Sequence, residues 1–147
     1  MIRTFAVSLT IPDNEAFTAF ETLGRLGVPA ARVLRSDIWM FEVEEQGAGS
    51  LASTVSSIET IHNPNKHCLL ERASNEPEPG EVWIAARDEA PATHVAGRSI
   101  PGVHAIRRRT SWRLLDEGGR DVDSAILHHA VETFLCNPAF QVAISGS

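Results

Sequence analysis

The sequence has few of the residues, and none of the short motifs, that mark the common enzyme and metal-binding families. It contains two cysteines, Cys68 and Cys136, which lie far apart and form no CxxC pair. A structural disulfide or a zinc site is therefore not expected. There is no glycine-rich phosphate loop, no G-x-S-x-G, no H-E-x-x-H and no EF-hand loop. The sequence thus predicts no catalytic residues, no cofactor and no metal.

Long apolar runs are also missing, since none approaches the ~20 residues that span a membrane. The N-terminal residues Met1-Ile2-Arg3 lead into an alternating apolar pattern and not into a signal peptide. The formal net charge of −6 argues against a protein that binds nucleic-acid backbones. The chain is 43% apolar and 22% charged, as in soluble globular proteins. We expect a cytoplasmic protein with no membrane or nucleic-acid partner.

One stretch of the sequence occurs twice. Ile58-Glu59-Thr60-Ile61 leads into Asn63-Pro64, and Val131-Glu132-Thr133-Phe134 leads into Asn137-Pro138. The spacing between the copies also holds upstream, where the equivalent pairs are Arg35 with Arg108 and Trp39 with Trp112. The sequence therefore predicts a tandem duplication, with one repeat at residues 1–73 and the other at residues 81–147. Residues 74–80 are rich in proline and glutamate and are predicted to be the linker.

Hydrophobic periodicity predicts the same elements in both repeats. In the first repeat, alternation over residues 3–11 predicts a strand, and apolar residues at three- and four-residue steps predict a helix over 15–26. Residues 28–45 predict a β-hairpin with a turn near Ser36-Asp37. Ser50 is the predicted cap of a second helix, which Pro64 ends before a last strand over 66–72.

The second repeat follows the same order with a shorter first helix. Residues 81–87 predict a strand, residues 92–99 two helical turns, and residues 103–116 a hairpin. A helix capped by Asp121 or Asp123 and a strand over 140–144 complete it. The predicted fold class is α+β: two tandem ferredoxin-like βαββαβ units, each an antiparallel sheet with helices on one face. The bare sheet faces favour an intramolecular pseudo-dimer.

The histidines are the remaining candidates for chemistry. His128 and His129 face different directions on a helix and suit chelation poorly, whereas His128 and Glu132 share a face. That pair fits a solvated helix surface better than a metal site. His62 and His67 flank the first Asn-Pro turn, but the second repeat has Gln141 in place of His67, so the repeat does not maintain the pair. A loop-lining role in one copy is the alternative.

Three arginines and two tryptophans offer binding alternatives. Arg107-Arg108-Arg109 lies on a predicted strand, where side chains alternate between faces, so a solvated edge competes with anion recognition. Trp39 and Trp112 fit the sheet core, and their equivalent positions also fit an interface. The residues predicted to lie at an interface between the repeats or with a partner are Trp39, Trp112, Arg35, Arg108, Asn63 and Asn137.

The pattern of each repeat resembles the PurS family, the small subunit of bacterial and archaeal phosphoribosylformylglycinamidine synthase in purine biosynthesis. The family pattern is Gly-Val, then V-R-x-G-K and a β-run, then a helix closing at Asn-Pro. The matching residues are Gly27-Val28, Val33-Leu34-Arg35-Ser36-Asp37 and Asn63-Pro64 in the first repeat, and Gly102-Val103, Ile106-Arg107-Arg108-Arg109 and Asn137-Pro138 in the second. Together they span nearly the whole chain.

The resemblance implies a non-catalytic role and a PurS-like fold. PurS-like proteins bridge a glutaminase and an ATP-dependent synthetase and support ammonia transfer between them. The expected function is therefore an accessory subunit of this glutamine amidotransferase complex, forming homo-oligomers, or a diverged relative of it. The alternative is a regulatory module of the ACT type, in which paired ferredoxin-like units bind a small metabolite.

Overall fold

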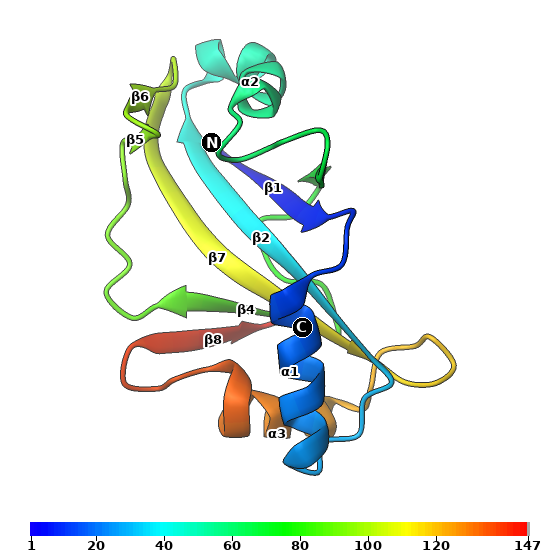
Figure 1. Ribbon diagram of the computed structural model, residues 1–147. Coiled ribbons are helices and arrows are strands. Elements are labelled where there is room, and N and C mark those ends of the chain that lie inside the picture. Colours follow the sequence, from blue (N-terminus) through cyan, green and yellow to red (C-terminus); the bar gives the residue numbers. More distant parts are fainter. Residues whose placement is uncertain (147) are drawn as a thin grey trace. The chain divides into compact units, whose positions relative to one another are not determined.

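The computed structural model describes residues 1–146 and has a mixed α+β fold (Figure 1). Six strands form one antiparallel sheet in the order β3-β1-β2-β7-β4-β8. These strands are β1 (Ile2–Leu9), β2 (Arg32–Val43), β3 (His67–Arg72), β4 (Glu81–Ala86), β7 (Val103–Leu115) and β8 (Gln141–Ser145). The helices of the described residues are α1 (Asn14–Arg25), α2 (Glu45–Ser57) and α3 (Ser124–Ala130), which continues as a π-helical turn, η1 (Val131–Leu135). The predicted α+β class is confirmed.

Helix α1 forms where its sequence predicts. Asp13 caps it, because its carboxylate accepts hydrogen bonds from the backbone N–H groups of Glu15 and Ala16, at 3.0 and 3.1 Å. Gly27 follows the helix with a φ of +79°, a conformation that favours glycine. Ala16, Ala19 and Leu23 form the buried stripe of the helix.

The two predicted β-hairpins are wrong, because each segment is one continuous strand. β2 runs through Ser36-Asp37 without a turn, and β7 runs through Arg108-Arg109. Neither strand contains a glycine, the residue that most readily takes the positive φ of a tight hairpin turn. Figure 1 shows β2 and β7 as two long neighbouring strands.

Two further predictions about helices need correction. Ser50, the predicted cap, lies inside α2, which begins at Glu45, and α2 ends at Ser57, well before Pro64. Residues 92–99 form no helix. They contain a small two-stranded sheet, β5 (His94–Val95) and β6 (Arg98–Ser99), because Ala96 and Gly97 both take positive φ in the turn between the strands.

The chain forms two compact units, and each draws on both halves of the sequence. Unit 1 comprises Met1–Ile11, Asp37–Asn75 and Glu89–Arg108. Unit 2 comprises Pro12–Ser36, Glu76–Asp88 and the chain from Arg109 onwards. The boundaries between the units fall inside β2, at Ser36-Asp37 where the first hairpin turn was predicted, and inside β7, within the segment predicted as the second hairpin.

Each unit has its own hydrophobic core, and each core combines residues from both halves of the sequence. In unit 1, Val95, Ile100 and Ile106 of the second half pack with residues of the first half, which are Phe5, Val7, Trp39, Phe41, Val43, Leu51, Val55, Ile58 and Ile61. In unit 2, Ala19, Leu23, Val28 and Val33 of the first half pack with residues of the second half, which are Val82, Ile84, Trp112, Leu114, Leu127, Ala130 and Leu135. Neither half of the chain therefore holds a complete core by itself.

No helix within residues 1–146 is long and apolar enough to cross a membrane.

Candidate functional site

The two Asn-Pro turns have the same geometry. In unit 1 the carbonyl of Asn63 accepts hydrogen bonds from the N–H groups of Lys66 and His67, and the Asn63 side chain accepts one from Asn65 N at 3.0 Å. In unit 2 the Asn137 carbonyl accepts from Phe140 and Gln141, and its side chain accepts from Ala139 N at 3.1 Å. These Asx turns lead directly into β3 and β8, so both asparagines have a structural role in the turn.

One side chain closes each turn from the first residue of the following strand. His67 Nδ1 accepts a hydrogen bond from the backbone N–H of Asn63 at 2.9 Å. Gln141 Oε1 accepts one from Asn137 N at the same distance. The residue type differs, but both copies keep a side-chain acceptor for the backbone N–H of the asparagine. The expectation that the second repeat does not maintain the role of His67 is therefore corrected. Burial, followed by the nearby charges of Lys66 and His62, lowers the pKa of His67 below its ordinary value, and Asp37 opposes this.

The two predicted interface tryptophans lie in the cores. Trp39 is buried in the unit 1 core, with its ring stacked beside Phe41, and Trp112 is buried in the unit 2 core. Arg108 places its guanidinium 4.9 Å from the centre of the Trp39 ring and bonds Asp37 at 3.0 Å. A role in binding a partner stays a prediction for these residues.

The remaining arginines singled out by the sequence are also engaged within their units. In unit 2, Arg35 bonds Glu15 at 3.0 Å and lies 3.7 Å from the capping carboxylate of Asp13. In unit 1, Arg107 lies between Glu42 and Glu89, at 3.8 and 3.5 Å. In each contact, carboxylates of the same unit offset the positive charge of the arginine. This favours a structural role for the arginines over a shared anion-binding site.

His128 and Glu132 form the predicted pair on one helical face. Their side chains lie 2.9 Å apart and are 73% and 62% exposed. Among residues 1–146, no group of three or more His, Cys, Asp or Glu side chains is arranged to hold a metal ion. The pair is a solvated surface contact.

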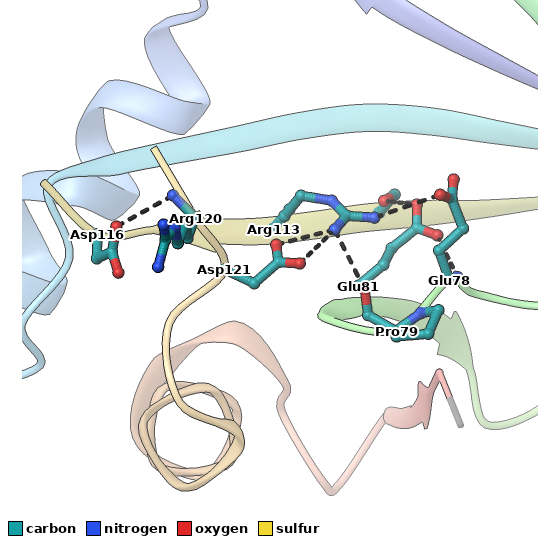
Figure 2. A network of polar contacts seen from close by, with 8 residues as sticks. Glu78, Pro79, Glu81, Arg113, Asp116, Arg120 and Asp121 are labelled. Carbon is teal, nitrogen blue, oxygen red and sulfur yellow. Dashed lines mark hydrogen bonds and ion pairs between the residues drawn. The ribbon is translucent and has the colours of Figure 1, made fainter. Parts of the chain in front are cut away.

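Sequence reasoning missed a polar network around Arg113 in unit 2 (Figure 2). Arg113 Nη1 donates to both carboxylate oxygens of Asp121, at 2.8 and 2.9 Å, and to the carbonyl of Pro79 at 3.2 Å. The carboxylate of Glu78 lies 3.8 Å from Arg113 Nη2. This network ties the turn before β4 to β7 and to the segment before α3.

Glu81 lies at the buried side of this network. Its side chain accepts hydrogen bonds from the backbone N–H of Glu78, at 2.8 Å, and from the hydroxyl of Ser111. The residue is 4% exposed, so these bonds offset the cost of burying a carboxylate. No sequence motif marks it, because Ser111 lies on a different strand, β7, thirty residues further along the chain.

Beside the network lies a cavity of about 500 Å³, whose lining residues all belong to unit 2. It lies between the start of α3 and the adjoining ends of β4 and β8. Its apolar side includes Leu127, Val131 and Ala143. Its polar groups include Asp121, Ser124, His128 and Ser145. The volume falls within the range of small-molecule sites, roughly 300–1,000 Å³.

No protein-family model matches the chain, and no curated protein is significantly similar to it.

Proposed function

We propose that this protein is a non-catalytic PurS-like subunit that bridges the glutaminase and synthetase of a phosphoribosylformylglycinamidine synthase complex. The observation that carries the proposal is the strand order inside each unit. Unit 1 has the order β3-β1-β2-β7 and unit 2 the order β8-β4-β7-β2. In both, the last strand of a repeat lies beside its first strand, and the two half-strands of β2 and β7 complete the sheet.

We propose on this basis that unit 2 has a ferredoxin-like arrangement, and that unit 1 is a variant of it in which the β5-β6 sheet stands in place of the first helix. In unit 2 the elements are β4, α1, part of β2, part of β7, α3 with η1, and β8. This is a βαββαβ set in which α1 and the half of β2 come from the other repeat. Exchange of identical elements between two copies is the relationship found in domain-swapped dimers. A duplicated PurS-like chain would contain both partners of such a pair in one polypeptide.

The chemistry of the singled-out side chains supports a binding role. Asn63 and Asn137 form turns, Trp39 and Trp112 fill cores, and Arg35 and Arg108 pair with carboxylates. Each residue thus has a partner that stabilises the fold. This leaves surface recognition as the activity best supported by these contacts.

Helix α1 offers a surface for that recognition. Its buried stripe is made of alanines and one leucine, while Phe17 and Phe20 point outward and are 60% and 38% exposed. Two exposed phenylalanines one helical turn apart are unusual on a surface that meets only water. We assign this face to contact with one of the larger subunits.

Reconstitution of the complex tests the proposed function. The full chain is expected to co-purify with the synthetase and glutaminase of its own organism. Its removal should lower glutamine-dependent synthesis while leaving ammonia-dependent synthesis intact, because added ammonia bypasses the transfer between sites. Normal glutamine-dependent synthesis in its absence, with no association, would rule the proposal out.

A further inference from the structure

The cavity of unit 2 has a filled counterpart in unit 1. The equivalence follows from the two turns, because His67 and Gln141 occupy the same place in each, so that Leu69 corresponds to Ala143 and Glu71 to Ser145. Leu69 pairs with Val7 and Ala143 with Ile84 across the neighbouring strands. Arg3 lies four residues before Val7, and Gly80 lies four residues before Ile84, so Arg3 and Gly80 are also equivalent.

In unit 1 these positions carry large side chains that fill the space beside α2. Arg3 donates through Nη2 to Glu71 at 2.7 Å and through Nη1 to the carbonyl of Ala48, in the first turns of α2, at 2.8 Å. This hydrogen bonding from Arg3 lowers the pKa of Glu71. Leu69 packs against the unit 1 core. A guanidinium group thus bridges the strands and the helix.

In unit 2 every one of these positions carries a small residue. Gly80 replaces arginine, Ala143 replaces leucine, and Ser145 replaces glutamate. All three line the cavity. The hollow therefore lies where Ala143 and Ser145 are small, whereas the place beside Gly80 is taken by the carboxylate of Asp121, 2.4 Å from where a Cβ of residue 80 would lie.

The charges around the cavity favour a cation. Asp121 lines it, and although Arg113 donates to both of its oxygens, each carboxylate oxygen retains a second lone pair that can accept. Glu78, which does not line the cavity, shares the single positive charge of Arg113 with Asp121, so the three side chains together leave a net negative charge beside the cavity. Hydroxyl groups of Ser124 and Ser145 supply neutral acceptors, and Leu127 supplies an apolar wall.

We propose that this cavity binds a small organic cation, with a guanidinium or ammonium group on a short apolar chain. The cationic group would lie toward Asp121 and the chain toward Leu127 and Ala143. This site is independent of the partner role proposed above, because it concerns the interior side of α3 and not the exposed face of α1.

Calorimetric titration of the full chain with agmatine tests the site, with diaminobutane and the neutral N-butylurea as comparison ligands. Agmatine or diaminobutane is expected to bind at millimolar concentration or below, and N-butylurea at least about tenfold more weakly. The variant A143L restores the bulk that unit 1 has at Leu69, and S145L adds bulk at a second residue that lines the cavity. Each should weaken binding of the cation about tenfold or more.

The matched control is V142L. Val142 is the neighbouring residue of β8, is 41% exposed and points to the opposite face of the strand, so its variant places the same leucine side chain outside the cavity. It should bind as the unmodified chain does. The proposal would be overturned if the unmodified chain bound no cation, or if it bound N-butylurea as tightly as the cations. It would also be overturned if A143L or S145L kept the native circular dichroism spectrum and still bound the cation fully.

Discussion

His67 Nδ1 accepts a hydrogen bond from the backbone N–H of Asn63, at 2.9 Å, and thereby fixes the turn that starts β3. The acceptor must be an unprotonated ring nitrogen, and the pKa of His67 is lowered, chiefly by burial. Gln141 makes the same bond in unit 2 without a titrating group. The same backbone N–H group is therefore bound by a side chain that titrates in unit 1 and by one that does not titrate in unit 2.

This difference predicts a pH-dependent contribution to stability from His67. Because its pKa is lower in the folded chain, the unfolded chain binds more protons in the range below the ordinary histidine pKa of about 6.5. The contribution of His67 should be complete above this pH and should decline as the pH falls through that value and toward the folded pKa. Urea unfolding between pH 5 and 8 measures the effect.

The variants H67Q and H67A separate the hydrogen bond from the titration. H67Q copies Gln141, so it should keep the stability of the unmodified chain at neutral pH and lose less of it on acidification. H67A should be less stable by about 1 kcal/mol at neutral pH, since it leaves the Asn63 amide without this acceptor. Parallel pH profiles for H67Q and the unmodified chain would contradict the assignment.

Gly80 is predicted to be intolerant of a side chain. Its φ is +84°, and a Cβ there would lie 2.4 Å from the carboxylate of Asp121. The variant G80A should lose about 2 kcal/mol or more of unfolding free energy. Gly27 is the matched control, because its φ is +79° but nothing lies within 4 Å of its Cβ position. G27A should lose only about 1 kcal/mol, and equal losses for the two variants would show that the Asp121 contact does not matter.

The exposed face of α1 is predicted to carry the partner contact. The double variant F17S/F20S should keep the native circular dichroism spectrum, because neither phenylalanine belongs to the buried core of unit 2, yet it should bind the larger subunits at least about tenfold more weakly. Phe140 is 71% exposed in the turn before β8 and provides the control. Equal binding by F17S/F20S and F140S in a pull-down with purified subunits would remove α1 from the interface.

Local signals predicted much of the fold. The alternation of β1 and the helical period of α1 are specified by neighbouring residues, and both elements form where expected. The large apolar residues Phe17, Phe20 and Leu26, which carry that period, are nevertheless exposed, and the buried stripe is formed by Ala16, Ala19 and Leu23. The turns at Asn63 and Asn137 are likewise local, since each asparagine bonds groups a few residues away. The duplicated stretch therefore marks corresponding turns in the two units.

The paths of β2 and β7 required information that is not local. The absence of glycine from residues 32–43 argues locally against a tight turn at Ser36-Asp37, but how far the strand continues depends on β1 and β7, the strands on either side of it. The candidate site was missed for a related reason. The cavity is lined by Gly80, Ala143 and Ser145 together, and their proximity follows from strand pairing and not from sequence spacing.

Cleavage of the linker tests most directly the claim that each compact unit is assembled from both halves of the chain. A protease site inserted after Ser74, which is exposed and outside the strands, allows the folded chain to be cut between the repeats. Because each core contains residues of both halves, the two fragments should remain together on size-exclusion chromatography and separate only in denaturant. Two folded fragments that separate under native conditions would contradict the account.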